Sequence, residues 1–571
     1  MRRAPTFRPD WSEEPPPAGS FRAIFKYGHP AGFKHPSDAW YAMLKADFGL
    51  TDEDFRTRRN EGREAVVLTR PPTLADRQVA ALTAIVGAPN VAQDEFTRAR
   101  YAHGKTTEEM MELSRGVVRE IADLVVHPRH KEDVRRIVAF CHAEKIPIYV
   151  FAGGSSVTLG LRPACGGITL VMSTHMNRFL ELNEDNQTAR VQPGILGPAY
   201  EDALNRAPER FRTRRRYTGG HFPQSFEYST VGGWVVTLGS GQASTYYGDA
   251  ADLVVSQEYV TPTGDFKTLD FPATATGPKI NDLMKGSEGC FGILVEVTMR
   301  VFRHMPANRR HFSFMFPTWL SAVEASREIA QGEFGRPAVY RISDPEETDR
   351  GLKLYGIPAL VDRILRKRGF DPQQRCLCLG SVEGDGDYTR LVKRKIRRIA
   401  RRYGAAYLGG YGSRKWARTR FREPYMREDL NDFGITIDTL ETAVTWERLM
   451  DLHRGVRDFI KGRPQTICMA HASHFYPQGT NLYFIFVGRF ASVDDYRAFQ
   501  AGIIDRIQRQ GGSLSHHHGV GRLMAPWIET HLGQAQMDVL RAVKNHLDPH
   551  HIMNPGGQLG LDLDPQKRRT P

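Results

Sequence analysis

The amino-acid sequence predicts an α+β protein with two mixed domains and a helical N-terminal extension. Short apolar runs of strand character alternate with amphipathic helical patterns on both sides of about residue 303. Glycine-rich loops follow buried strands in the first of these two parts. The composition, with 40% apolar and 25% charged residues among 571, is that of a soluble globular chain with apolar material for more than one core.

The N-terminal extension is predicted to be helical over residues 21–120, with capping candidates at Ser37 and Thr106. Residues 1–20 are rich in proline and are predicted to be disordered, as are residues 562–571. The first residues are basic but no apolar run follows them, so a secretory signal is not expected. A membrane-spanning helix is not expected either, because no run of about 18 uncharged apolar residues occurs.

The first domain is predicted over residues 121–303 and begins with a strand–helix–strand unit. Residues 124–126 have the character of a short strand, and apolar residues spaced i, i+3, i+4 and i+7 predict a helix from Lys131 to Glu144. The buried strand 146–151 then runs directly into a glycine loop. Further strands are predicted within residues 167–172, 188–192, 253–261 and 284–298.

Three glycine-bearing loops of this domain, residues 153–156, 229–233 and 286–292, are candidates for binding an anion. Glycine allows positive φ and lets backbone N–H groups approach a ligand closely, and neighbouring Ser and Thr hydroxyls add donors. A pyrophosphate suits such loops, although for any one of them alone a tight turn is the better interpretation. A Rossmann or P-loop site is disfavoured, because neither glycine fingerprint occurs at the required place.

The second domain is predicted over residues 304–561, where strands alternate with amphipathic helices. Strands are expected at residues 310–315, 377–384 and 482–487, and helices at 319–331 and 494–510. Residues 390–402 carry eight lysines and arginines beside an apolar stripe. Such a helix can lie on an anionic membrane surface, but packing on the domain with its basic face in water is the better interpretation.

The net charge of +13 favours anionic partners such as phosphates or acidic lipids. Nucleic acid is not expected as a partner, since the charge is spread along the chain and no zinc-finger or aromatic RNA-binding signature occurs. Six scattered cysteines form neither a disulfide framework nor a zinc pair, which favours a reducing, cytoplasmic location.

Several of these motifs together resemble those of a known superfamily. Residues 148–160, 220–234 and 286–289 are similar to the FAD-binding domain of vanillyl-alcohol-oxidase (VAO) type flavoproteins, the PCMH-type domain. Residues 511–521, with three consecutive histidines, resemble the C-terminal signature of the alkyldihydroxyacetonephosphate synthase family, flavoenzymes of ether-lipid synthesis. The resemblance implies a PCMH/VAO-type FAD domain of two α/β subdomains, an α+β cap domain over the flavin, noncovalent FAD and a homodimer.

The resemblance also implies which residues bind the cofactor. Residues 150–156 and 223–229 would follow the ADP, pyrophosphate and ribityl chain, while residues 237–241 and 288–294 would approach the flavin ring. The implied cofactor-binding residues are Val150, Phe151, Ala152, Gly153, Gly154, Ser155, Ser156, Pro223, Gln224, Ser225, Phe226, Glu227, Tyr228, Ser229, Thr237, Leu238, Gly239, Ser240, Glu288, Gly289, Cys290, Phe291, Gly292, Ile293 and Leu294. The chain departs from the family pattern at Ala152, Gln224 and Leu238, where the family has glycine, aspartate and arginine.

The implied reaction exchanges the acyl group of acyl-dihydroxyacetone phosphate for a fatty alcohol through an adduct at flavin N5. Tyr483 matches the family's acid/base tyrosine, and His516, His517, His518 and Arg427 are the candidates for positive charge that would favour its phenolate. Arg341 and Arg427 match arginines suited to gripping the substrate phosphate. From the residue pattern alone, a core tyrosine is the better interpretation of Tyr483, and each arginine is more often a solvated surface charge.

The main alternative is an FAD-dependent oxidase or dehydrogenase of a hydroxy acid or alcohol, similar to D-lactate dehydrogenase. Those relatives bind a divalent metal through a histidine and a glutamate at the places where this chain has Tyr483 and His517. We therefore expect no metal, with the histidine run contacting substrate and cofactor instead. His471 and His474 remain as substitute ligands or core histidines. A noncatalytic binder of nucleic acid or acidic lipid is the third, least favoured hypothesis.

Overall fold

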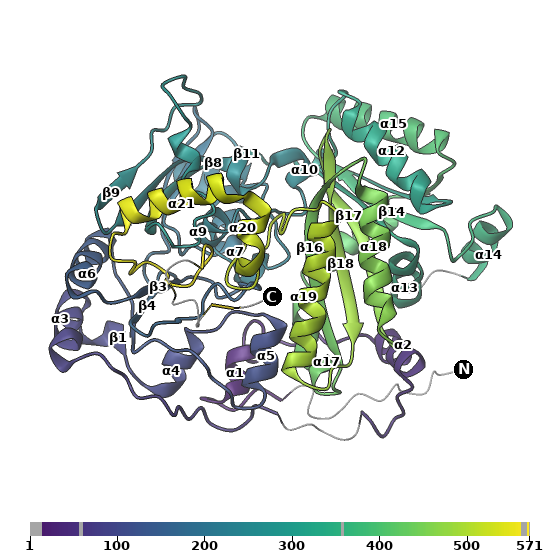
Figure 1. The fold of residues 1–571 in the computed structure, drawn as a ribbon. Coiled ribbons are helices and arrows are strands. Elements are labelled where there is room, and N and C mark those ends of the chain that lie inside the picture. The colour runs from purple at the N-terminus through teal and green to yellow at the C-terminus, as the bar shows by residue number, and fades with distance from the viewer. Residues whose placement is uncertain (1–13, 56–60, 356–358, 561–562, 564–567, 570–571) are drawn as a thin grey trace.

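The computed structural model describes residues 14–55, 61–355, 359–560, 563, 568 and 569. Figure 1 shows two lobes side by side, with helices from the N-terminal region running beneath them. Most of the residues predicted to be disordered, 1–13 and seven of the last ten, lie outside the described residues. Residues 14–20 lead into a turn whose Ser20 forms an isolated bridge with Ala65. Among the described residues, no helix combines the length and apolar character that crossing a membrane requires.

The N-terminal region is mainly helical and touches both lobes. Its helices are α1 (Phe21–Phe25), α2 (Asp38–Phe48), α3 (Asp76–Val86), α4 (Glu95–Arg100) and α5 (Thr107–Leu113). Thr106 caps α5 and Glu109 closes a capping box, which fixes where this helix begins. Tyr41 and Leu44 of α2 are buried in one cluster with Leu430 and Ile467 of the second lobe. The extension is thus part of the fold's interior rather than an appendage.

The first lobe contains two sheets. The smaller has the order β1–β2–β4–β3, with parallel pairing among β2 (Leu124–Val126), β4 (Ile168–Val171) and β3 (Ile148–Phe151), while β1 (Val91–Ala92) pairs antiparallel to β2. Helix α6 (Lys131–Glu144) packs Val134, Ile137 and Val138 against it, as its apolar spacing predicts. The loop after β3 therefore leaves the carboxyl edge of a parallel sheet, a usual place for ligand sites.

The larger sheet of this lobe is antiparallel, with the order β5–β6–β10–β8–β9. Its strands are β5 (Phe179–Asn183), β6 (Thr188–Val191), β8 (Val254–Thr261), β9 (Gly264–Lys267) and β10 (Ile293–Arg300). Between β6 and β8 the chain forms α7 (Gly197–Asn205), α8 (Ala207–Phe211), β7 (Tyr217–Thr218), α9 (Val231–Val236), α10 (Ser244–Tyr247) and α11 (Ala250–Leu253). Strand β7 pairs with β11 (Phe302–Arg303), close to the predicted domain boundary.

The second lobe is built on a seven-stranded antiparallel sheet with the order β15–β12–β14–β13–β17–β18–β16. The strands are β12 (Arg310–Phe316), β13 (Val339–Ser343), β14 (Cys376–Val382), β15 (Ala406–Gly409), β16 (Thr436–Thr445), β17 (Ile467–Phe475) and β18 (Gly479–Gly488). Leu482, Phe484 and Phe486 alternate along β18 and are fully buried in the core with α18 (Leu449–Gly462) and α19 (Val493–Arg509). Residues between them, such as Tyr483, therefore lie on the opposite face.

Further helices complete this lobe. They are α12 (Trp319–Gln331), α13 (Pro345–Tyr355), α14 (Ala359–Lys367), α15 (Gly386–Arg402), α16 (Tyr411–Thr419) and α17 (Arg427–Asn431). The basic helix predicted at 390–402 lies within α15, whose Val392, Ile396 and Ile399 are buried against the lobe. Its apolar stripe is thus already packed, and its basic residues face outward.

The C-terminal segment does not stay with the second lobe. Helices α20 (Ala525–Leu532) and α21 (Gln534–Leu547) cross back over the first lobe (Figure 1). Met553 bridges Ile148 in parallel, and Ile148 N donates to Ile552 O at 2.7 Å. The second domain is predicted to extend to residue 561, but its last part packs on the first lobe. Apolar periodicity locates a helix but does not tell which core the helix joins.

Candidate active site

The register of three neighbouring strands brings the predicted acid/base tyrosine into a group of polar side chains. Tyr483 on β18 lies directly opposite His471 on β17 and Glu441 on β16. Residues opposite each other in antiparallel strands point to the same face. The face that carries these three side chains is the one turned away from α18 and α19.

Glu441 anchors the run of three histidines. Its carboxylate accepts hydrogen bonds from the backbone N–H of His516 (2.8 Å), His517 (3.1 Å) and His518 (3.0 Å). Ser515 Oγ (2.7 Å) and Asn481 Nδ2 (3.1 Å) donate to the same group. Burial alone would raise the pKa of Glu441, but the surrounding histidines and donors hold that pKa below its usual range. An ionised carboxylate thus fixes the backbone of the loop that presents the imidazoles.

The imidazoles enclose Tyr483. Its ring stacks on His471 with centroids 4.9 Å apart and on His517 at 6.0 Å, and His518 meets it edge-on at 5.6 Å. The Tyr483 hydroxyl donates to Thr439 Oγ1 at 3.0 Å. Burial raises the pKa of Tyr483 to about 12; the Thr439 hydrogen bond opposes the rise, Glu441 adds to it and Arg427 opposes it. Tyr483 is therefore a phenol at neutral pH.

The expected positive charge on the histidine run is wrong for two of its members. Burial lowers the pKa of His517 well below its usual range and also lowers that of His518, against the attraction of Glu441. The side chains of these two residues are only 14% and 16% exposed, so the charged form loses most of its hydration. His517 and His518 are neutral at pH 7 and can accept protons from a neighbour.

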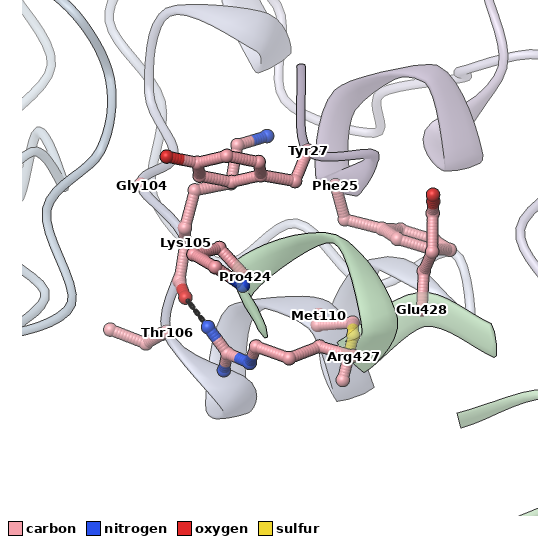
Figure 2. Close-up of a pocket in the computed structure, with 9 residues that line it drawn as sticks. All are labelled: Phe25, Tyr27, Gly104, Lys105, Thr106, Met110, Pro424, Arg427 and Glu428. Atoms are coloured by element: carbon pink, nitrogen blue, oxygen red, sulfur yellow. Dashed lines mark hydrogen bonds between the residues drawn. The ribbon is translucent and has the colours of Figure 1, made fainter. Parts of the chain in front are cut away.

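Arg427 lies at the edge of this group and ties the N-terminal region to the second lobe. Figure 2 shows its guanidinium directed at the carbonyl of Lys105, 2.5 Å from Nη1, and it also donates to Thr107 Oγ1. Asp438 lies 3.7 Å away. The small cavity beside it, about 20 Å³, is large enough for about one water molecule. Arg427 acts on Tyr483 through its charge rather than through a direct contact.

Arg341 is held in a separate ion pair. It contacts Glu347 of α13, whose carboxylate also lies 3.3 Å from His471 Nδ1. Burial would raise the pKa of Glu347, but Arg341 and His471 lower it to about 2. Arg341 is thus linked to Tyr483 through Glu347 and His471. The described contacts do not bring it to Arg427, so a shared phosphate grip by the two arginines stays a prediction.

On the first lobe, the predicted cofactor loops meet backbone to backbone. A Cβ added at Gly153 would lie 2.3 Å from the carbonyl oxygen of Tyr228, so only glycine fits there. Gly154 has φ +68°, and Lys105 N donates to Ser156 O at 2.7 Å. The loop after β3 is thereby fixed by two other segments of the chain. Its conformation is one that glycine adopts without strain.

Many of the predicted cofactor residues direct their side chains elsewhere. Gln224 Nε2 donates to Arg420 O (2.5 Å) and to Glu423 Oε2 (2.7 Å), and Glu227 Oε2 accepts from Lys34 (2.6 Å) and Tyr425 (2.7 Å). The side chains of Phe226, Cys290, Ile293 and Leu294 are at most 9% exposed and belong to the core. At these positions the predicted contact with the cofactor can hold for the backbone but not for the side chains. Matching residues to a family motif does not distinguish backbone contacts from side-chain contacts.

Between the lobes lies a cavity of about 280 Å³. It is lined on one side by Thr237, Leu238 and Glu288, and on the other by His516 and His517. Both Leu238 (φ +52°) and Glu288 (φ +49°) have left-handed backbone, a conformation that bulky residues adopt at a cost and that clusters at functional sites. Residues predicted to approach a flavin ring and the histidine run therefore face one cavity.

Comparison with known proteins identifies the family. Residues 122–270 match the model of the FAD binding domain, and residues 305–557 match the C-terminal domain of FAD linked oxidases. The alkyldihydroxyacetonephosphate synthase of Dictyostelium discoideum is 32% identical over 505 residues, which is 85% of this chain and 81% of that protein. The chain belongs to the alkyldihydroxyacetonephosphate synthase family.

Two further members of the family agree with this assignment. The synthase of Caenorhabditis elegans is 29% identical, with 80% of this chain and 79% of that protein aligned. A crystal structure of an alkyldihydroxyacetonephosphate synthase superposes with a TM-score of 0.76 at 28% identity, covering 91% of this chain and 90% of that one. The predicted PCMH/VAO-type fold is confirmed.

FAD is the cofactor of this family member, and the structure fits it. Leu238 and Glu288, both with left-handed backbone, line the cavity between the lobes, and the glycine loop after β3 leaves no room for a side chain at Gly153. When bound, FAD supplies an electrophilic ring to a substrate carbon. The residues of this chain that would face it are Thr237, Leu238 and Glu288 from the first lobe and His516 and His517 from the second.

Glu441, His517 and His518 also lie close enough together to hold a metal ion, their ligand atoms being within 4.8 Å of one another. However, a carboxylate offers about four lone-pair sites, and five donors already point at Glu441. The positive ends of three backbone N–H groups surround it, which disfavours a cation. The geometry suits a loop anchor better than a metal ligand.

The sequence interpretation missed Glu441, Thr439, Glu347 and Asp249, all of which contact predicted site residues or their neighbours. For Glu441 a signal was present. Residues 436–445 are rich in threonine and other β-branched residues, the composition of a strand, and Glu441 is a carboxylate within it. The partner of that carboxylate could not be read from the sequence, because 75 residues separate it from His516.

Proposed function

We propose that this protein is an FAD-dependent alkyldihydroxyacetonephosphate synthase that exchanges the acyl group of acyl-dihydroxyacetone phosphate for a fatty alcohol. The observation that carries the proposal is the enclosure of Tyr483 by the imidazoles of His471, His517 and His518, of which His517 also lines the cavity between the lobes. A phenol with a pKa of about 12 is a proton donor at neutral pH, and neutral His517 and His518 are the acceptors beside it.

The exchange is balanced without net oxidation. The bond from the substrate carbon to the acyloxy group breaks and the carboxylate leaves with the bonding pair. A bond from the same carbon to the alcohol oxygen forms, and the alcohol proton is released. No electrons remain on the FAD, so the site needs proton carriers rather than an electron acceptor. Tyr483 and the histidines are such carriers. We propose that FAD is held noncovalently, through the backbone of the loops around Gly153.

Arg341 and Arg427 are proposed to bind the substrate phosphate. Both guanidiniums are partly exposed, at 23% and 19% of their side chains, so each retains donors for a ligand. Their present partners are a carboxylate and a backbone carbonyl. A phosphate would compete with Glu347 for Arg341, and this competition predicts that substrate binding weakens the Glu347 ion pair.

Tyr483→Phe tests the assignment of the proton donor. Purified protein should show a flavin spectrum and exchange the acyl chain of acyl-dihydroxyacetone phosphate for hexadecanol. The variant should keep its FAD and lose activity by at least about 100-fold, as removal of a general acid does. Tyr217→Phe is the control, because it removes another buried tyrosine hydroxyl, 3.0 Å from Glu184, far from the site. Full exchange activity in Tyr483→Phe would refute the role.

The same preparation tests the redox alternative. Anaerobic mixing with hydroxy acids and alcohols would bleach the flavin if the protein were an oxidase or dehydrogenase. We expect no bleaching with any of them and turnover only with the acyl ester and alcohol. Bleaching by a hydroxy acid, without acyl exchange, would replace the proposal by a D-lactate dehydrogenase-like activity.

We also propose peripheral contact with an anionic membrane, which would deliver lipid substrates. Helix α14 projects from the right-hand lobe in Figure 1, with Leu360, Val361 and Ile364 exposed by 66%, 38% and 42%. Arg363 and Arg366 are exposed on the same short helix. Flotation with phosphatidylserine vesicles should be lost in Leu360→Asp/Ile364→Asp. A cytoplasmic location and a homodimer complete the proposal, to be checked by cell fractionation and light scattering.

A further inference from the structure

A chain of hydrogen bonds leads from the histidine run out of the active site. Tyr476, just after β17, lies with its hydroxyl 2.7 Å from His516 Nε2 and 2.8 Å from Asp249 Oδ2. His516 Nδ1 is in turn 3.0 Å from His517 Nδ1. The four side chains come from three distant parts of the sequence and from both lobes. His517 stacks on Tyr483 at one end.

The number of protons on these four side chains fixes which group donates and which accepts in each hydrogen bond. Tyr476 donates its single proton to Asp249 Oδ2, so the phenol oxygen accepts from His516 Nε2–H. A neutral His516 that is protonated at Nε2 has an acceptor at Nδ1, which requires His517 Nδ1 to be the donor. His517 Nε2 is then left as an acceptor. Each proton in these hydrogen bonds is thereby assigned, and His517 Nε2 can accept one more.

The two ends differ in their access to water. His517 is 14% exposed, and burial keeps its pKa well below the usual range, so a proton placed on it is not stable there. Asp249 is partly exposed and caps α11 at the junction of the lobes. It is also contacted by Ser240 Oγ. A proton that reaches Asp249 is next to solvent, whereas the neighbours of His517 Nδ1 are His516 Nδ1 at 3.0 Å and Glu441 Oε2 at 3.5 Å.

We propose that His517, His516, Tyr476 and Asp249 form a proton relay between solvent and the cavity that His516 and His517 line. The inference deepens the proposed function, on which it rests, by stating how the proton released in the exchange leaves the site. When His517 Nε2 gains a proton, the Nδ1 proton moves to His516 Nδ1, the Nε2 proton of His516 to Tyr476, and the Tyr476 proton to Asp249. Four bonds to hydrogen form, four break, and no electron is transferred.

The alternative is that Tyr476 merely clamps the two lobes. A clamp would alter stability and substrate binding together, whereas a relay alters turnover and leaves KM in place. Two variants separate these roles. Tyr476→Phe keeps the ring but removes the bridging hydroxyl, and Asp249→Asn keeps the helix cap, since asparagine caps as well as aspartate does. Tyr217→Phe again serves as the matched control, because it loses a tyrosine–carboxylate hydrogen bond outside the relay.

The first measurement does not depend on activity. In FAD-loaded protein labelled with ¹⁵N-histidine, His516 should give the signals of an imidazole protonated at Nε2 alone, with His516→Gln used for assignment. Tyr476→Phe should shift this tautomer balance and Tyr217→Phe should not. A His516 protonated only at Nδ1 in the unaltered protein would overturn the relay, whatever reaction the protein catalyses.

The second measurement uses turnover. In both Tyr476→Phe and Asp249→Asn, kcat for acyl exchange should fall at least tenfold with KM within twofold and FAD content unchanged. Unaltered kcat in the two variants, or a loss of kcat matched by an equal rise in KM, would overturn the relay in favour of a clamp. Should Tyr476→Phe fail to fold, Asp249→Asn decides alone. If the unaltered protein exchanges no acyl chain, the proposed function fails while the tautomer measurement still judges the relay.

Discussion

The candidate site has two walls, one from each lobe, and different chemical groups form them. On the first lobe, the wall consists of backbone: glycines with no room for a Cβ, left-handed residues and loops held by N–H and C=O groups. On the second lobe it consists of side chains: Tyr483, the histidine run and the buried carboxylate Glu441. A wall of backbone groups can bind a cofactor whose identity stays the same, whereas a wall of side chains can transfer protons and distinguish substrates. Changes to the two walls should therefore have separable effects.

The largest effect is expected on the backbone wall. Gly153→Ala places a Cβ 2.3 Å from the carbonyl oxygen of Tyr228, and neither loop can retreat without losing its contacts. FAD affinity should fall about 100-fold, equivalent to roughly 3 kcal/mol. Absorbance of the bound flavin after gel filtration measures it. Gly351→Ala, where nothing lies within 4 Å of the added Cβ, is the matched control and should bind FAD normally.

A smaller effect is expected from the anchor of the side-chain wall. Glu441→Gln keeps the shape but replaces an acceptor-only group by one whose NH₂ faces backbone N–H groups. The free energy of unfolding should fall by about 2 kcal/mol and kcat by about tenfold to 100-fold, with FAD retained. Urea unfolding and exchange assays measure the two. Glu447→Gln, at a residue whose side chain is 78% exposed, should change neither. Loss of FAD in Glu441→Gln would contradict the separation of the walls.

The smallest effect concerns pH. The pKa of Glu347 is about 2 in the folded protein, below the value of about 4.3 for an unfolded chain. Its contribution to stability is therefore full above pH 4.3 and is lost as the pH falls toward 2. Relative to Glu347→Gln, the unaltered protein should lose about 1–2 kcal/mol between pH 6 and pH 3. Urea midpoints across this range measure the difference, and parallel pH profiles would refute the ion-pair account.

The difference between the walls also explains what the sequence could reveal. The loops at 153–156 and 286–292 were recognisable because glycine is itself the signal for close backbone approach. Strands 124–126 and 482–487 and helix 131–144 were predicted from periodicity and are present in the structure. Tyr483 and the histidines were found only by resemblance, since a tyrosine on a strand has no pattern of its own.

The protonation of the side-chain wall was beyond sequence reasoning. Three adjacent histidines suggested positive charge, but their charge depends on how much water reaches them and on which carboxylate lies beneath. Glu441 and Asp249 approach the histidine run from positions far apart in the chain. Only the strand register and the return of the C-terminal segment bring these groups together. The same return moved residues predicted for the second domain onto the first.

That return has a consequence for biosynthesis. Strand β3, whose end leads into the Gly153 loop, is bordered by Ile552 and Met553, about 400 residues further along the chain. The parallel sheet that carries this loop therefore lacks a border until almost all of the polypeptide has left the ribosome. A chain interrupted before residue 550 would emerge with this sheet unfinished, however well its N-terminal half had folded.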